Sequence, residues 1–307
     1  MSEAVTSITV MTDEEFYAAQ SRVTEPGKFA ATVKGVPGSL SAMRRAARQL
    51  VFHYRADGDF AENGIAAERI AEIDTRYAED MLARLTELAD QPLGADRKPC
   101  ERLLGCCRDF TVLFLSMARA HSVPVRARVG FAGYFPPGWY VDHVVAQVWD
   151  EAQQRWRLVD AELADDYADP ATGTPLDAED LTSSQFLTGA AAWAACRDGS
   201  ADPDRFCVSP DLDIPVTRGL RYVRHNLIHD LAALTGHEML LWDDWGWSEL
   251  DKLAPSQLAV LDDLAAAMNR DAPLTELMSF YERDGLRVPS EVTSYSPASE
   301  VPLRVAM

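Results

Sequence analysis

The sequence lacks long apolar runs. No window approaches about 18 consecutive apolar residues, so no membrane-spanning helix is expected. The first 20 residues contain Asp13, Glu14 and Glu15 and lack the apolar segment found in secretory signal peptides. These absences predict a protein that neither spans a membrane nor carries a secretion signal.

Basic residues are scarce relative to acidic ones. The chain has 29 lysines and arginines against 48 aspartates and glutamates, which gives a formal net charge of −19 and a pI of about 4.6. Such a surface repels phosphate backbones, so no nucleic-acid partner is expected. The acidic charge serves solubility in one interpretation and attracts a cationic or amine substrate in another.

Cysteine is sparse and irregularly spaced. The five cysteines include no C-x-x-C pair, a usage typical of reduced thiols in a cytoplasmic protein. No D-x-D-x-D-G calcium loop occurs. His225 and His229 have the i, i+4 spacing of a zinc pair, but Asn226 stands where the metalloprotease signature has glutamate, and no third ligand is evident. We therefore expect no metal and no cofactor.

The 307 residues can bury a sizeable core as one large domain or two. Helical patterns dominate residues 1–98 and 166–288, whereas residues 99–165 combine one helix with strands. Residues 289–307 are rich in serine and proline and are expected to be extended or disordered. The predicted fold class is α+β, with mainly helical regions on both sides of a mixed core.

The helix of that core carries two adjacent cysteines at its start. An apolar stripe of Phe110, Leu113, Phe114 and Met117 predicts a helix over roughly 106–121, preceded by a glycine and followed by a proline. Unpaired N–H groups and the helix dipole favour a thiolate in the first turn. Cys106 extends the buried stripe, whereas Cys107 lies at its edge, so Cys107 is favoured as the reactive thiol.

Two strands beyond this helix carry a histidine and an aspartate. In VDHVVAQVWD, His143 shares a face with Val145 and Gln147, and in RWRLVDA, Asp160 shares a face with Leu158. If residues 151–154 make the turn, the expected register places His143 directly opposite Asp160. Cross-strand neighbours are about 5 Å apart, which is close enough for a carboxylate to orient an imidazole.

These residues resemble the transglutaminase-like superfamily. The G-x-C-R-D-F pattern at residues 105–110, Asp142-His143 at the start of a strand and the W-x-x-x-D pattern at residues 156–160 match that family in type, order and context, over about 60 residues. The flanking segments FLTGAAAW and WDDWGW are similar to bacterial transglutaminase-domain proteins. Many members have an aromatic residue after the histidine, where this chain has Val144.

The resemblance implies a papain-like core with the catalytic triad Cys107, His143 and Asp160. His143 would deprotonate Cys107 while Asp160 holds its tautomer, and the thiolate would attack an amide or thioester carbonyl. The Cys107 N–H would donate to the oxyanion, with a second donor not identified. Water or an amine would then resolve the thioester. The expected substrate is a small molecule or peptide, and an amine is one potential acceptor of the acyl group.

Two other functions stay open at this stage, a cytoplasmic cysteine protease and a non-catalytic binding module that uses the same cleft. An aromatic loop precedes the histidine, and Tyr134, Trp139 and Asp142 are candidates for the substrate cleft. In the alternative interpretation, the loop aromatics cap the core.

Two further clusters allow more than one interpretation. A helix over 39–53 is expected to turn Arg44, Arg45 and Arg48 outward, as a solvated face paired with acids or as a site for an anion. The aromatic cluster at residues 242–247 either packs the C-terminal region onto the core or forms a stacking platform for a ligand.

Overall fold

The computed structural model describes residues 11–307. Its central sheet has the strand order β5-β4-β3-β6, with β7 paired beside β4. Neighbouring strands are antiparallel except for the β4–β7 pair, which is parallel. The strands are β3 (Val125–Ala132), β4 (Tyr140–Asp150), β5 (Arg155–Val159), β6 (Phe186–Thr188) and β7 (Phe206–Cys207).

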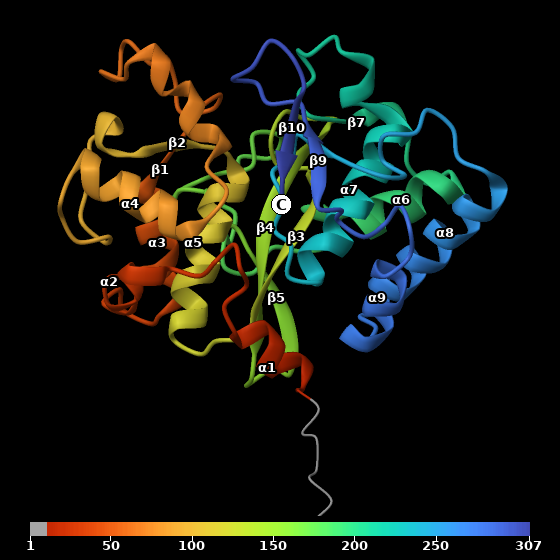
Figure 1. The fold of residues 1–307 in the computed structure, drawn as a ribbon, viewed down its shortest axis with the longest axis horizontal. Helices are drawn as coiled ribbons and strands as arrows, with labels where there is room; N and C mark the ends of the chain where they lie inside the picture. The colour runs from red at the N-terminus through yellow and green to blue at the C-terminus, as the bar shows by residue number, and fades with distance from the viewer. Residues whose placement is uncertain (1–10) are drawn as a thin grey trace, which may run out of the picture.

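Helices cover this sheet from two sides, and Figure 1 shows α2–α5 on one side of the central strands and α6–α9 on the other. The helix α5 (Cys107–Ala120) packs on β3 and β4, α2, α3 and α4 pack against α5, and α1 contacts both α5 and β3. Valines and alanines of β3 and β4 that face α5 join it in one buried cluster. The N-terminal helices are α1 (Asp13–Ala18), α2 (Ala30–Lys34), α3 (Leu40–Leu50) and α4 (Ala78–Leu88).

The helix α7 (Gly219–Leu234) covers the part of β3 that no strand pairs on that side. Its Asp230 accepts the backbone N–H of Val129 (3.0 Å), and its Asn226 donates to the carbonyl of Gly130 (3.0 Å). These contacts satisfy backbone groups that an open strand edge would leave unpaired. The helices beside α7 are α6 (Gly189–Asp198), α8 (Pro255–Asn269) and α9 (Leu274–Tyr281).

Short elements complete the chain. The strand β1 (Val51–His53) pairs with β2 (Leu103–Gly105) directly before α5. The 3-10 turns are η1 (Gly27–Phe29), η2 (Ala67–Asp74), η3 (Pro99–Glu101), η4 (Pro203–Arg205) and η5 (Pro215–Thr217). A second sheet contains β8 (Asp243–Asp244), β9 (Glu291–Ser294) and β10 (Leu303–Ala306) in the order β10-β9-β8.

The α+β fold class, with the cysteine-bearing helix on an antiparallel sheet, is confirmed. Residues 289–307, expected to be extended or disordered, hold β9 and β10, and β9 pairs with β8 inside the aromatic cluster 242–247. No helix within residues 11–307 is long and apolar enough to cross a membrane. Residues 1–10, part of the segment in which no signal peptide was expected, lie outside the described residues.

The basic patch of α3 differs from its predicted orientation. Ser39 caps the helix by accepting the N–H of Ala42, and the helix ends at Leu50, where β1 begins. Arg44 is buried rather than solvated: it donates to the carbonyl of Leu163 (2.6 Å) and pairs with Asp165. The prediction that Arg44 faces outward is therefore wrong, because this side chain ties α3 to the segment after β5.

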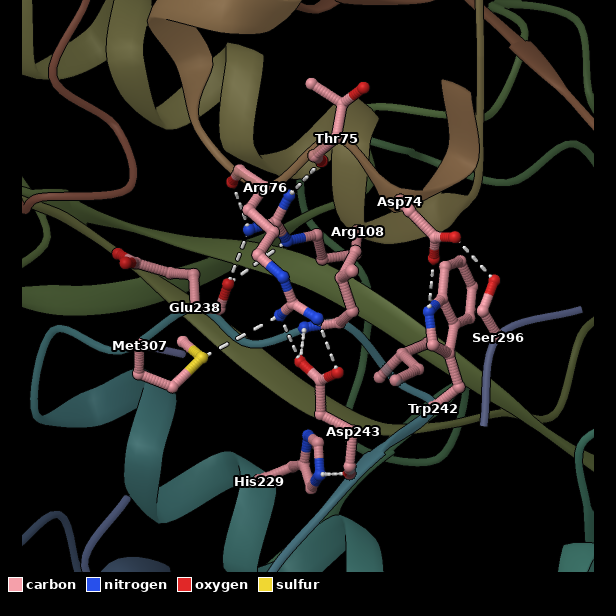
Figure 2. A network of polar contacts seen from close by, with 12 residues as sticks. Asp74, Thr75, Arg76, Arg108, His229, Glu238, Trp242, Asp243, Ser296 and Met307 are labelled. Atoms are coloured by element: carbon pink, nitrogen blue, oxygen red, sulfur yellow. Dashed lines mark hydrogen bonds and ion pairs between the residues drawn. The ribbon is translucent and has the colours of Figure 1, made fainter. Parts of the chain in front are cut away.

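A buried polar network ties the start of α5 to the C-terminal region (Figure 2). Arg76 forms a two-pronged ion pair with Asp243, whose carboxylate is fully buried (2.5 and 2.8 Å). Arg108, the residue after Cys107, donates to the carbonyls of Arg76 and Glu238, both at 2.6 Å. Trp242 donates to Asp74 (2.9 Å), which also accepts from Ser296 (2.7 Å). The network thus fixes the first turn of α5 against segments distant in sequence.

We expect Asp243→Ala to lower the free energy of unfolding by about 3–5 kcal/mol, because it leaves the Arg76 guanidinium buried without its partner. Urea denaturation measures this loss. The matched control is Asp180→Ala, which removes a far more exposed ion pair with Arg155 and should therefore cost much less stability. Equal losses in the two variants would show that the network does not stabilise the fold as argued.

Candidate active site

The first turn of α5 places Cys107 at the helix start. Cys106 is the N-cap residue, with an extended backbone, and its N–H donates to Oδ2 of Asp109 (2.8 Å) in the manner of a capping box. Asp109 is itself held by Arg108 (3.0 Å). The helix therefore begins at Cys107, where backbone N–H groups have no partner within the helix.

The structure brings Cys107, His143 and Asp160 together. Nε2 of His143 lies 2.8 Å from Oδ2 of Asp160, and all three side chains are buried. Sγ of Cys107, a ring nitrogen of His143 and a carboxylate oxygen of Glu162 all lie within 4.8 Å of one another. Because Nε2 is engaged by Asp160, Nδ1 is the nitrogen left to exchange a proton with Cys107.

The strand register that produces this contact differs from the expected one. The turn at residues 151–154 is as predicted, but Asp150 pairs with Arg155 and Gln147 pairs with Leu158, a shift of two residues. His143 is paired with Gly130 of β3, and Asp160 follows the last residue of β5. A shift of two preserves which face each side chain occupies, so the aspartate still reaches the imidazole diagonally.

Asp160 is held by several donors. Its Oδ2 accepts from the Tyr134 hydroxyl (2.5 Å) as well as from His143, and its Oδ1 accepts the backbone N–H groups of Glu162 (2.8 Å) and Leu163 (3.3 Å). Burial alone would raise the pKa of Asp160, but the charge and hydrogen bond of His143 and the other donors lower it. Asp160 is therefore ionised and fixed in orientation.

The environment raises the pKa of both groups that exchange the proton, the imidazole of His143 and the thiol of Cys107. Burial alone would lower the pKa of His143, but the adjacent Asp160 more than offsets this and raises it. The hydrogen bond with Cys106, burial and the nearby carboxylates of Glu162 and Asp142 raise the pKa of Cys107 well above its ordinary value. The thiolate that the helix start favours is thus opposed, and the resting form is a neutral thiol.

A cavity of about 810 Å³ opens in front of this group. Its walls come from three parts of the chain. The N-terminal region contributes His53 and Tyr54 after β1, the core contributes the residues around Cys107 and His143, and the C-terminal region contributes the segment 208–217 together with residues of α7 and the tail. Cys106 also lines this cavity, but Cys107 is the cysteine within 4.8 Å of both His143 and Glu162.

Of the three predicted cleft residues, Asp142 lies on the cavity wall, and Tyr134 and Trp139 do not. Tyr134 is buried and supports Asp160 through its hydroxyl. Trp139 lies near the guanidinium groups of Arg205 and Arg218, at 5.3 and 6.0 Å from the ring centre. The expectation that these two aromatics line the cleft is wrong, because the loop turns them onto neighbouring side chains.

Asp142 is engaged rather than free. Tyr222 donates to its Oδ2 (2.5 Å) and Asn226 to its Oδ1 (2.8 Å), both from α7. Burial raises the pKa of Asp142, and these two donors only partly offset it. Asp142 therefore joins the strand of His143 to α7 on the floor of the cavity.

Sequence reasoning missed Glu162 and Tyr54. Glu162 stands two residues after Asp160, and burial raises its pKa to about 7. Tyr54 lies directly after β1 and lines the cavity. The only signal for Glu162 was its place beside the aspartate of the W-x-x-x-D pattern, and Tyr54 had none, since its position depends on how β1 packs beside β2.

Among the described residues, one group of three histidine, cysteine or acidic side chains is close enough to share a metal ion. It consists of Cys107, His143 and Glu162. The same group suits acid–base chemistry, because it sets a thiol beside an imidazole whose other nitrogen lies 2.8 Å from Asp160. His225 and His229 stack at 4.1 Å, and each donates Nε2–H to a backbone carbonyl. This pair is therefore engaged in packing.

The aromatic cluster 242–247 divides between packing and the cavity wall. Trp245 is buried and lies 4.6 Å from the ring of His229, so it packs the C-terminal region. Trp242 lines the cavity while its indole N–H donates to Asp74. One of the three tryptophans thus reaches the wall of the candidate site.

Comparison with known proteins is consistent with this core. The sequence model of the transglutaminase-like superfamily matches residues 95–161, which contain Cys107, His143 and Asp160. No curated protein sequence matches the chain. A crystal structure described as a putative cysteine protease from Cytophaga hutchinsonii is similar over 56% of this chain and 48% of that one, about half of its length, with 17% identity and a TM-score of 0.34.

The superfamily match supports cysteine-based catalysis as the general function. It spans the helix start, both strands and the aspartate, which are the elements that build the buried group. Residues 95–161 of this chain are therefore a region similar to the core of the transglutaminase-like superfamily.

Proposed function

We propose that the protein catalyses cysteine-dependent acyl transfer at an amide or thioester carbonyl of a small molecule or peptide, through a thioester on Cys107. The observation that carries this is the convergence of Cys107, His143 and Asp160, with Cys107 and His143 on the wall of one cavity of about 810 Å³. Such a set is the arrangement that nucleophilic catalysis requires: a thiol, a base beside it and a carboxylate that orients the base.

In the first half-reaction, Nδ1 of His143 takes the proton of the Cys107 thiol as sulfur bonds to the carbonyl carbon. Asp160 stabilises the resulting imidazolium. His143 then gives this proton to the leaving group as the bond from carbon to nitrogen or sulfur breaks, which leaves the acyl thioester. Because the resting thiol is neutral, proton transfer accompanies the attack rather than preceding it.

In the second half-reaction, His143 takes a proton from water or an amine that attacks the thioester carbonyl. The bond between carbon and sulfur breaks, and Cys107 leaves with the proton from His143. The backbone N–H of Cys107 is one donor for the oxyanion. The Tyr54 hydroxyl is a candidate for the second, since it lines the cavity and burial raises its pKa so that it keeps its proton.

Two observations bear on the compartment and on the competing function. The five cysteines are all unpaired, which supports a reducing, cytoplasmic compartment. The raised pKa of Cys107 favours a second candidate, a non-catalytic module that binds its ligand in the same cavity.

A panel of acyl thioesters, simple amides and peptides tests the proposal, with released thiol or amine as the readout and with or without an added primary amine. Acid quenching followed by peptide mass spectrometry is expected to find the acyl group on Cys107. Faster turnover in the presence of the amine would indicate acyl transfer. Turnover that the amine does not accelerate would indicate hydrolysis. Preferred cleavage of peptides would indicate a protease. Ligand binding without any adduct would replace the proposal with the binding module.

A further inference from the structure

Glu162 is placed beside the candidate nucleophile by the same aspartate that orients the base. Its backbone N–H donates to Oδ1 of Asp160 (2.8 Å), which fixes the residue in the segment after β5. Its Oε2 lies 3.9 Å from Nδ1 of His143, and the carboxylate is within 4.8 Å of Sγ of Cys107. The side chain is 13% exposed and lines the cavity. The carboxylate therefore lies where the acyl group of a substrate must bind.

Within residues 11–307, the close charged contact of this carboxylate is the long one to Nδ1 of His143, which is a cation only when the ring is protonated. Oε2 is buried and accepts no hydrogen bond. The charges of His143 and, less strongly, Arg48 help to stabilise the ionised form, but the guanidinium of Arg48 is already bound to Asp57 at 2.8 and 3.2 Å. A buried carboxylate oxygen without a donor costs free energy, and a ligand that supplies a donor recovers it.

The other carboxylates near the floor of the cavity are engaged. Asp142 accepts from Tyr222 and Asn226, and Asp244 accepts from Ser248 and lies 3.7 Å from His225. Asp211 belongs to the exposed segment that forms the outer wall. Glu162 is thus the carboxylate beside the thiol that a ligand can pair with.

We propose that Glu162 binds an ammonium group on the acyl donor itself, so that the cavity takes aminoacyl donors, meaning esters, thioesters or amides of α-amino acids. The inference rests on the proposed acyl transfer. In an α-aminoacyl thioester, the nitrogen is three bonds from sulfur, at roughly 3–4 Å. A carboxylate oxygen within 4.8 Å of that sulfur can then accept from the ammonium at about 2.8 Å.

The ammonium belongs to the donor rather than to the acceptor for a chemical reason. An acceptor amine must be neutral to attack the thioester, and an ion pair with a carboxylate stabilises its unreactive, charged form. The ammonium of the donor takes no part in the bond changes, so an ion pair with Glu162 stabilises the bound donor without blocking the reaction.

An apolar part of the cavity wall favours an apolar side chain on the bound amino acid. Leu212, Ile214 and Val216 line this wall, and Ile214 and Val216 are 46% and 49% exposed. Apolar side chains left this exposed beside a binding site gain free energy when a ligand covers them. An α-amino acid with an apolar side chain fits both the carboxylate and this wall.

The test compares three thioesters of N-acetylcysteamine, made from leucine, N-acetyl-leucine and 4-methylpentanoic acid, which differ only at the α-nitrogen. Wild type is expected to prefer the leucyl donor in kcat/KM. Glu162→Gln should lower that value by about 10- to 100-fold, with little change for 4-methylpentanoyl. The control is Glu87→Gln, which removes an exposed carboxylate of α4 paired with Arg84. The proposal would be overturned if Glu162→Gln lowered kcat/KM equally for all three donors. It would also be overturned if the loss occurred only when an amine acceptor was present.

A binding measurement separates this proposal from the proposed function. The Cys107→Ala protein, which cannot be acylated, is titrated calorimetrically with leucinamide and 4-methylpentanamide. Leucinamide is expected to bind about 10- to 100-fold more tightly, and Glu162→Gln in the same background should remove the difference. Binding with this preference but no turnover would sink acyl transfer alone. Turnover without any preference for the ammonium, or equal binding of both amides, would sink the role of Glu162.

Discussion

Replacing Cys107 with alanine is expected to abolish acyl transfer, with kcat/KM falling on the order of 10⁴-fold or more. The reason is that the acyl group is held on this sulfur between the two half-reactions, and no other group can take its place. Cys107 is the cysteine whose Sγ lies within 4.8 Å of both His143 and Glu162. The measurement is turnover of the best donor found in the thioester and amide panel.

Two other cysteines provide matched controls. Cys106→Ala alters the cavity wall and the hydrogen bond to Cys107, but it leaves the group with His143 intact, so activity should stay within about tenfold of wild type. Cys196→Ala changes a half-buried thiol of α6 outside the cavity and should leave activity unaltered. If Cys106→Ala were the inactive variant and Cys107→Ala the active one, the nucleophile would be reassigned.

The elements with strong periodicity could be predicted from the sequence. The apolar stripe after the two cysteines gave α5 within one residue of each end, and strand alternation placed His143 on the face from which it meets Asp160. The register was wrong by two residues, because a turn at residues 151–154 pairs Asp150 with Arg155, and the expected pairing of His143 with Asp160 did not follow from that turn. The predicted contact between His143 and Asp160 was still correct, because a register shift of an even number of residues leaves each side chain on the same face of the sheet.

The parts that could not be predicted depend on contacts between distant segments. The cavity has walls from β1, from the segment 208–217 and from the tail, and no local pattern shows that these meet. Arg44 resembles a solvated residue on its own helix, yet its partners lie after β5. Tyr134 resembled a cleft aromatic, but its hydroxyl donates to Asp160 behind the imidazole. Burial of a polar side chain is decided by partners that sequence spacing does not reveal.

Asp160→Asn is expected to lower kcat on the order of 10³- to 10⁴-fold while the protein stays folded. The asparagine oxygen can keep accepting the N–H groups of Glu162 and Leu163, which directs its NH₂ group toward Nε2 of His143. Nε2 must then accept, so the proton moves to Nδ1, the nitrogen that should take the thiol proton. The histidine is thereby locked in the tautomer that cannot act as a base toward Cys107.

The pH profile distinguishes this tautomer effect from a general loss of structure. In the wild type, Asp160 raises the pKa of His143, and the base is the neutral imidazole, so activity should increase as pH rises through that pKa. Removing the carboxylate charge lowers the pKa of His143, so the residual activity of Asp160→Asn should begin to rise at lower pH. Tyr134→Phe, which removes one donor to Asp160 but keeps the ring, should cost only about tenfold. An Asp160→Asn protein with more than a tenth of wild-type kcat and an unshifted profile would show that Asp160 does not orient the base.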